Sequence, residues 1–250
     1  MHTSDLHLGD PFQQLPAGRH QTMCLCPLLA VLMAARDFGA HAILIAGDLF
    51  DHGRVTRDQV AGVFGVLASS GVESVVLPGN HDPWLADSQY RELADRAERV
   101  HLISDPRGEV VRLGAAAGLQ AQLAVWGRAL PCHTPADGPL RAETAPAWGG
   151  LWAVAMGHGE YVGSEPSVPG GFPRSSPIGA AEADGLGADY IALGHRHLPE
   201  LLGGLRTHAR YSGSPMTLHG AAGHVVLVEL SMSGVRGSVR PVALPPLGCH

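Results

Sequence analysis

Residues 42–51 read Ala-Ile-Leu-Ile-Ala-Gly-Asp-Leu-Phe-Asp, an apolar run that stops at Gly47 and then presents Asp48. A short, bounded apolar run is typical of a strand that is covered on both faces, as in a parallel sheet. We therefore predict a buried strand over residues 42–46. Because ligands bind at the carboxyl edge of such sheets, Asp48 is a candidate site residue. The alternative is an aspartate in a turn or at a helix N-cap.

The segments around this strand alternate between helical and strand patterns. Helices are predicted over residues 20–38 and 56–69, the second with Thr56 as its N-cap, and a buried strand over residues 72–77. This alternation predicts a parallel α/β core. Further along we expect a polar helix near 87–98, a short strand at 100–104, β-rich runs from 109 to 127, strands at 151–156 and 189–193, a short helix at 178–185 and strands over 209–244. The expected organisation is one domain over residues 1–250, with Pro/Gly-rich loops at 131–150 and 163–177.

Composition limits the classes of function. The net charge is −6, with 45% hydrophobic and 16% charged residues, so binding to nucleic acid would require a local arginine patch or bound metal ions. Four cysteines form no disulfide pattern and no CxxC pair, which favours a reduced, cytoplasmic compartment. No signal peptide and no apolar stretch long enough to cross a membrane is expected.

Polar side chains follow five apolar runs. In the first group, Asp5 and His7 alternate in what we expect to be extended chain, so both side chains point to one side. The full set is Asp5, His7, Asp48, Asn80, His81, His158, His195 and His197. With no cysteine among them, these residues describe an oxygen/nitrogen site for Mn, Fe or Zn. They exceed what one ion needs, which favours two metals sharing a bridging carboxylate.

Five ordered motifs resemble those of the calcineurin-like metallophosphoesterases. They are Asp5-Leu6-His7, Gly47-Asp48-Leu49-Phe50-Asp51, Gly79-Asn80-His81-Asp82, Gly157-His158 and Gly194-His195-Arg196-His197. The resemblance implies a four-layer α/β/β/α sandwich with a dinuclear centre at the strand ends. It also implies a first strand before His2, so we expect that strand to be truncated and Asp5 and His7 to be poorly anchored.

The resemblance also assigns roles to these residues. It implies that Asp5, His7 and His197 bind one metal, that Asn80, His158 and His195 bind the other, and that Asp48 bridges them. His81 would face the scissile phosphate and stabilise or protonate the leaving oxygen, with Asp82 orienting it. The predicted reaction is metal-assisted hydrolysis of a phosphate ester.

Within this superfamily, the segments at residues 4–9, 47–51 and 211–215 are most similar to SbcD-type DNA repair exonucleases. This implies DNA as the substrate, manganese as the metal, with iron or zinc as alternatives, and an SbcC-type ATPase partner. Because the sequence ends soon after these motifs, we expect the DNA-capping domain and the ATPase-binding segment of such nucleases to be missing. Alternatives are an enzyme acting on a small phosphoester and a non-catalytic metal-binding module. A basic rim is a further hypothesis, formed by Arg54, Arg57, Arg128, Arg196 and Arg210.

Overall fold

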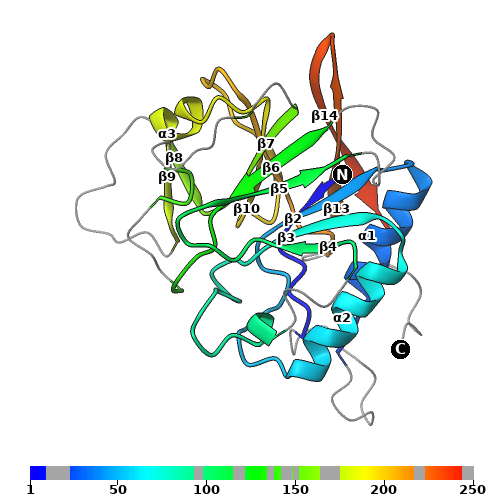
Figure 1. The fold of residues 1–250 in the computed structure, drawn as a ribbon. Helices are drawn as coiled ribbons and strands as arrows, with labels where there is room; N and C mark the ends of the chain where they lie inside the picture. Colours follow the sequence, from blue (N-terminus) through cyan, green and yellow to red (C-terminus); the bar gives the residue numbers. More distant parts are fainter. Residues whose placement is uncertain are drawn as a thin grey trace.

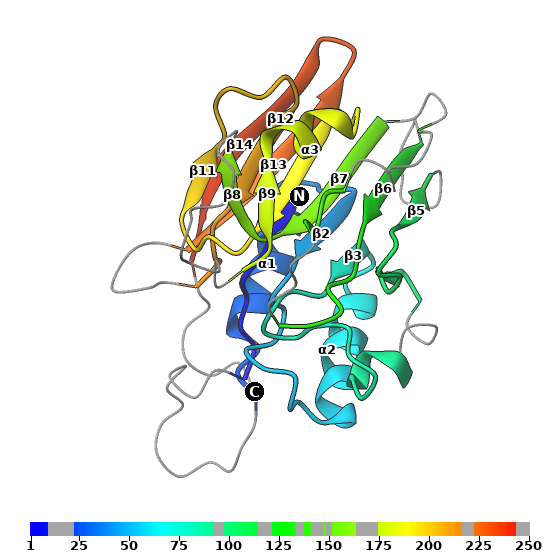
Figure 2. The same ribbon diagram turned by 90° about the vertical axis from the view of Figure 1, so that its left-hand side faces the viewer.

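Two six-stranded sheets lie face to face in the computed structural model, with helices on their outer sides (Figures 1 and 2). The structure describes residues 1–9, 23–92, 98–114, 122–133, 138–141, 148, 152–163, 175–216 and 223–243. Most of the predicted loop at 131–150 and of the loop at 163–177 therefore lies outside the described residues. Among those residues, no helix is long and apolar enough to cross a membrane.

The first sheet contains the opening strand and has the order β14-β13-β1-β2-β3-β4. Strands β1 to β4 are parallel, whereas β13 and β14 form an antiparallel hairpin beside β1. The bounds are His2–Thr3 for β1, Ala42–Ala46 for β2, Glu73–Leu77 for β3, Val100–Leu102 for β4, Gly223–Ser231 for β13 and Gly234–Val242 for β14. The hairpin of β13 and β14 thus completes the sheet that holds the N-terminus.

The second sheet has the order β11-β12-β10-β7-β6-β5. Its strands are β5 Glu109–Leu113, β6 Leu123–Gly127, β7 Trp152–His158, β10 Tyr190–Gly194, β11 Pro199–Leu201 and β12 His208–Ser212. Strands β5 and β6 are antiparallel, while β6, β7, β10 and β12 are parallel. A separate pair, β8 Glu160–Gly163 with β9 Pro177–Gly179, was not predicted, and neither was β11.

The helices are α1 Cys26–Asp37, α2 Arg57–Ser69 and α3 Ala180–Gly185. The expected polar helix near residues 87–98 is wrong in its described part, which is one 3-10 turn, η1 Gln89–Glu92. The physical reason for the difference is that the Tyr90 side chain is buried and its hydroxyl donates to Asp82 at 2.6 Å. Tertiary contact therefore decides the conformation of this short segment.

Side chains of β2 show how the layers form. Ile43 and Ile45 pack with α1 and α2, whereas Ala42, Leu44 and Ala46 pack against the second sheet. The far face of that sheet forms a third apolar cluster, in which Ala155 and Ile191 pack with Ala183 of α3. Figures 1 and 2 show α3 across the molecule from α1 and α2. The predicted α/β/β/α sandwich is confirmed.

The first strand is short but firmly placed. Strand β1 has two residues and lies between β2 and β13, with His2 opposite both Leu44 and Val226. The backbone N–H of Asp5 then donates to Gly47 O at 3.0 Å, and that of His7 donates to Asp48 O at 3.1 Å. The expectation that Asp5 and His7 are poorly anchored is therefore wrong, because backbone hydrogen bonds to the loop after β2 hold them.

Thr56 caps α2 as predicted, in a reciprocal arrangement. Its hydroxyl accepts from Gln59 N–H at 3.2 Å, and the Gln59 side chain accepts from Thr56 N–H at 2.8 Å. We expect Thr56→Ala to lower the free energy of unfolding by about 1 kcal/mol, because one helix N–H loses its partner. Urea unfolding measures this. Thr56→Ser, which keeps the acceptor, is the control, and an equal loss in both variants would contradict the capping role.

Candidate metal centre

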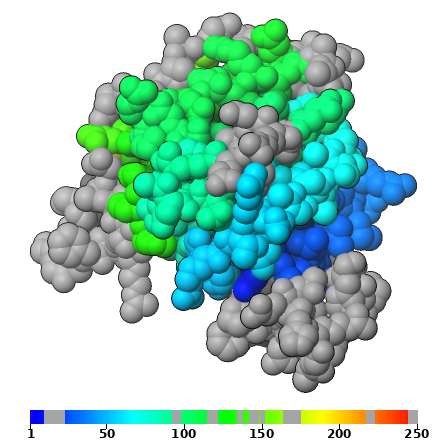
Figure 3. Space-filling model, turned by 60° about the horizontal axis from the view of Figure 1, so that its bottom comes forward, coloured from blue at the N-terminus to red at the C-terminus, as the bar shows by residue number. Residues whose placement is uncertain are grey.

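The predicted site residues follow strands from both sheets. Strands β1, β2 and β3 carry polar groups at their carboxyl ends in the first sheet, as β7 and β10 do in the second. In the space-filling view of Figure 3, the dark-blue N-terminal segment shows only a small patch of surface. Asp5, Asp48 and His158 are buried, with 0%, 2% and 0% of their surface exposed. Buried carboxylates are normally paired with a positive charge or bound to a metal.

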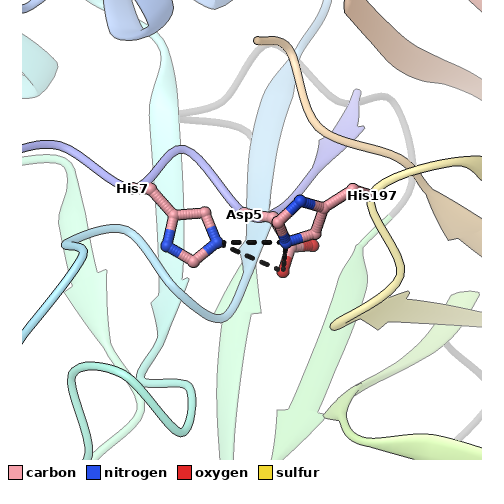
Figure 4. Close-up of side chains that lie close together, drawn as sticks. All are labelled: Asp5, His7 and His197. Atoms are coloured by element: carbon pink, nitrogen blue, oxygen red, sulfur yellow. Dashed lines mark hydrogen bonds and ion pairs between the residues drawn. The ribbon is translucent and has the colours of Figure 1, made fainter. Parts of the chain in front are cut away.

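Asp5, His7 and His197 form the first group, shown in Figure 4. The Nε2 atoms of the two imidazoles lie 3.2 Å apart. Asp5 Oδ1 lies 4.0 Å from His7 Nε2 and 3.7 Å from His197 Nε2. Two imidazoles and one carboxylate thus aim their ligand atoms at one point, which is the arrangement expected of a metal site.

Asp48, Asn80 and His158 form the second region. His158 Nε2 lies 3.2 Å from Asp48 Oδ2 and 2.9 Å from Asn80 Oδ1. On the other side of the ring, His158 Nδ1 donates to the carbonyl of Ala46 at 2.9 Å. That hydrogen bond leaves the lone pair of Nε2 for the site when the ring is neutral. Asp48 Oδ2 also lies 3.9 Å from His7 Nε2, so one carboxylate faces both groups.

His195 lies beside these residues in a different way. Its backbone N–H donates to Asp5 Oδ2 at 3.0 Å, and its ring centroid is 5.5 Å from that of His158. Its Nε2 lies 3.9 Å from Glu160 Oε2, a contact that the sequence did not suggest. Three clusters of described residues have ligand atoms within 4.8 Å of one another, and none includes His195. Its assignment as a ligand stays a prediction.

The structure corrects the role expected of Asp82. Its carboxylate accepts from Gly79 N–H at 2.8 Å, from Phe50 N–H at 2.9 Å and from the Tyr90 hydroxyl. These bonds tie the loop after β3 to the loop after β2, and do not orient the ring of His81. Burial, followed by the charge of Asp48, raises the pKa of Asp82. Asp82 therefore holds two loops of the site together.

His81 instead contacts Asp51. Its Nδ1 donates to the carbonyl of Asp51 at 2.7 Å, and its backbone N–H donates to Asp48 Oδ1 at 2.9 Å. The side chain of His81 is 44% exposed, whereas that of His7 is 10% exposed. A ring nitrogen of His81, together with atoms of His7 and Asp48, forms one of the three possible ligand clusters. That His81 does not bind metal stays a prediction.

Backbone strain marks the same residues. Among the described non-glycine residues, φ is positive at Asp5 (55°), His7 (47°), Asp48 (52°), His195 (108°) and Arg99. Four of these are predicted site residues, and strained conformations of this kind cluster at functional sites. The expectation of extended chain at Asp5 and His7 is wrong. The backbone bends at Asp5 and at His7 because their N–H groups donate to carbonyls of the loop after β2.

The electrostatics of the cluster favour a bound cation. Burial alone would lower the pKa of His158, but the Asp48 carboxylate outweighs it and raises the pKa to about 9. Burial raises the pKa of Asp48, yet His158 and then His7 bring it well below its usual range. The negative potential that favours a proton on His158 also favours a divalent ion. The buried carboxylates, imidazoles and amide oxygen therefore fit metal ions with mixed oxygen and nitrogen ligands.

Gly79 allows the loop after β3 to approach Asp48. A Cβ atom on Gly79 would lie 2.1 Å from Asp48 Oδ1 and 2.4 Å from its backbone nitrogen. Since the backbone cannot rotate away, we expect Gly79→Ala to cost about 1–3 kcal/mol of folding stability and to displace Asp48. Urea unfolding and Mn²⁺ titration measure the two effects. Gly62→Ala, on the exposed face of α2 with open space at its Cβ, is the matched control and should stabilise the fold.

A family model described as calcineurin-like phosphoesterase matches residues 1–199, which contain all the polar groups above. The chain belongs to the calcineurin-like phosphoesterase family. Among curated proteins, it is 29% identical to the D subunit of the SbcCD nuclease of Escherichia coli K12, over 98% of this chain and 68% of the relative. It is 27% identical to the Rhodobacter capsulatus protein of the same name, over 87% and 62%.

A solved structure has a similar fold. The crystal structure of TT1561 of Thermus thermophilus matches with a TM-score of 0.58 at 16% identity, over 94% of this chain and 96% of that one. At this identity the likeness concerns the fold alone.

Three residues in contact with the site were not predicted to act there: Asp51, Tyr90 and Glu160. Asp51 is the last residue of the motif at residues 47–51, so the sequence alone could have identified it as a site residue. Tyr90 and Glu160 lie in no such motif. Their contacts with Asp82 and His195 depend on tertiary packing.

Proposed function

We propose that this phosphoesterase is a dinuclear-metal-dependent, SbcD-like exonuclease that hydrolyses phosphodiester bonds in DNA. The observation that carries the proposal is the convergence of aspartate and histidine side chains from five strand ends around Asp48. The printed names of the E. coli and R. capsulatus relatives support the nuclease assignment. Because the chain spans 68% and 62% of their lengths, their complete activity is part of the proposal.

The metal assignment divides the ligands between two ions. Asp5, His7 and His197 would hold one, Asn80, His158 and His195 the other, and Asp48 would contact both. Manganese is the proposed metal, with iron or zinc as alternatives that the ligand types also suit. Bound divalent ions would neutralise the phosphate and lower the pKa of a water nucleophile.

The residues of the chain have distinct tasks in this proposal. The Ala46 carbonyl holds the His158 ring so that Nε2 faces the site, and the His81 N–H holds one oxygen of Asp48. Since the Nδ1–H of His81 donates to the Asp51 carbonyl, the proton for the leaving oxygen would come from Nε2 of the doubly protonated His81 imidazolium, which would become neutral. General acid catalysis of this kind contributes about 10²–10⁴-fold to the rate.

The decisive experiment is a Mn²⁺-dependent assay on linear duplex DNA, single-stranded DNA and a small chromogenic phosphodiester. We expect cleavage of linear DNA that stops with chelator and returns with added Mn²⁺. Hydrolysis of the small phosphodiester without cleavage of DNA would replace the nuclease with a small-phosphoester enzyme. No hydrolysis of any substrate in excess Mn²⁺ would leave a non-catalytic metal-binding module.

One observation favours the small phosphoester as a second candidate. DNA binding requires cations that are available to phosphates. However, Arg196 pairs with Glu160 and Glu200, and Arg128 donates to the carbonyls of Pro106 and Gly138. Two of the five arginines of the predicted basic rim therefore bind groups of the protein itself, which reduces their availability to DNA phosphates.

A binding partner and a compartment complete the proposal. The relatives are named as one subunit of a nuclease, SbcCD, which supports an SbcC-type ATPase as partner. Co-expression with such an ATPase, followed by size-exclusion chromatography, tests this association. The cytoplasmic location suggested by the cysteine pattern stays a prediction.

A further inference from the structure

Arg196 lies between two proposed metal ligands, His195 and His197, in the loop after β10. Its guanidinium binds two carboxylates, since Nε donates to Glu160 Oε1 at 3.1 Å and Nη1 donates to Glu200 Oε2. We propose that Arg196 is a positioning residue that joins the loop after β10 to the segment after β7, and so holds the proposed ligands on both in place. This inference rests on the proposed function, because it concerns the same two-metal site.

The segment after β7 and the loop after β10 meet where their strand pairing ends. Strands β7 and β10 are paired as far as His158 and Gly194. Just beyond this pair, the Gly159 N–H donates to the Gly194 carbonyl at 3.2 Å. Farther along, the side chains join the two segments, because both Nε and Nη2 of Arg196 donate to the Glu160 carboxylate. The ion pair thus links the two segments beyond the end of the β-ladder.

The backbone at His195 requires support of this kind. Its φ of 108° is rare for a residue other than glycine, and such a conformation persists only when the surrounding structure holds it. The His195 N–H donates to Asp5 Oδ2 at 3.0 Å, and the His197 carbonyl accepts from the Ser214 N–H at 3.0 Å. Arg196, between these two residues, adds a side-chain connection to the segment after β7.

The guanidinium also lies on a firmly held aromatic ring. Its carbon is 5.4 Å from the ring centroid of Tyr211 in β12, which is within the range of a cation–π interaction. Tyr211 is buried, and its hydroxyl donates to the Gly159 carbonyl at 2.8 Å and accepts from the Tyr161 N–H at 2.8 Å. The ring and the Glu160 carboxylate therefore fix Arg196 against the same short segment.

The charge of Arg196 and its positioning role predict opposite effects on metal binding. By Coulomb's law alone, removing a positive charge beside a cation site would strengthen Mn²⁺ binding. Loss of a residue that holds metal-binding histidines in place typically weakens metal affinity by about 10–100-fold. We expect this weakening for Arg196→Gln. Arg196→Lys keeps the charge but not the planar guanidinium that binds two carboxylates, so we expect a smaller loss.

Isothermal titration calorimetry with Mn²⁺ on the wild type, Arg196→Gln, Arg196→Lys and Arg206→Gln measures these changes. Arg206 has an 83% exposed side chain that lies 3.6 Å from Asp184, so Arg206→Gln breaks an ion pair of the same kind outside the site and should leave affinity unchanged. Equal or tighter binding by Arg196→Gln would overturn the inference. A wild type that binds no Mn²⁺ would overturn the proposed function, and this inference with it.

A double-mutant cycle tests whether Arg196 acts through Glu160. Glu160→Gln should also weaken Mn²⁺ binding, and the double variant should bind no more weakly than the weaker of the two single variants, because the pair acts as one unit. Fully additive losses would contradict positioning through Glu160.

Thermal unfolding and electron paramagnetic resonance separate positioning from a merely structural role. The Arg196 side chain is 39% exposed, and partly exposed ion pairs contribute little to stability, so the metal-free variants should unfold close to the wild-type temperature. With bound Mn²⁺, the wild type should show the spectrum of two coupled ions, and Arg196→Gln should show more of the spectrum of isolated ions. A lower unfolding temperature with unchanged Mn²⁺ affinity and spectrum would make Arg196 a structural residue only and overturn the inference.

Discussion

Asp48→Ala is expected to remove metal from the whole centre. Asp48 Oδ2 lies 3.2 Å from His158 Nε2 and 3.9 Å from His7 Nε2, so its carboxylate faces both proposed ligand groups. Without that charge, burial would dominate at His158 and the site would lose its attraction for cations. We expect metal content after dialysis to fall from about two ions per chain toward none, and hydrolysis to be lost with it.

Asp48→Asn separates this electrostatic effect from damage to the backbone. Asp48 has φ of 52°, a conformation that asparagine tolerates better than alanine. Asparagine also keeps an oxygen for the His81 N–H, so a folded protein without metal is expected. Elemental analysis after dialysis against buffer with and without Mn²⁺ measures the loss, with Asp58→Ala as the control. Retention of full metal content in Asp48→Asn would show that Asp48 does not bridge the ions.

His81→Ala is expected to separate catalysis from metal binding. The variant should retain its metal while turnover falls by about 10²-fold or more, because a general acid typically contributes at least that much. The loss should appear in kcat rather than in Mn²⁺ affinity, since all of the proposed ligands remain. His41→Ala, an exposed histidine before β2, removes the same ring and is expected to have no effect.

Two outcomes with His81→Ala would contradict its role as the acid. Unchanged turnover would remove His81 from the mechanism. A loss of metal together with activity would instead place its ring among the ligands, consistent with the cluster of His7, Asp48 and His81. Single-turnover kinetics at saturating Mn²⁺ distinguish a slower chemical step from weaker substrate binding.

Local patterns predicted the elements whose structure depends on nearby residues. The buried strand at residues 42–46 is β2, because its continuous apolar pattern suits a strand packed on both faces. Thr56 caps α2 because the cap depends on residues three apart. The polar residues at the strand ends were also identified from the chain alone, since all but Asp5 and His7 come just after an apolar run.

Predictions failed where distant segments meet. The first strand is held by β13, more than two hundred residues away, so its stability was not visible near His2. The short strands β8, β9 and β11 carry no strong alternation and depend on pairing. Asp82 follows His81 in the sequence, but its carboxylate accepts hydrogen bonds from Phe50 N–H and the Tyr90 hydroxyl, because a buried carboxylate requires hydrogen-bond partners.

The sequence by itself determined which residue types stand at the ends of which strands, and so placed Asp48 after a buried strand. Its apolar runs were enough for this, because burial follows hydrophobicity and spacing. Only the tertiary structure decided how these ends meet. Two sheets bring Asp5, Asp48 and His158 together, and the loop after β2 sets Asp51 against His7 and His81. The physical reason is that ligand geometry depends on backbone bends and hydrogen bonds between segments far apart in the chain.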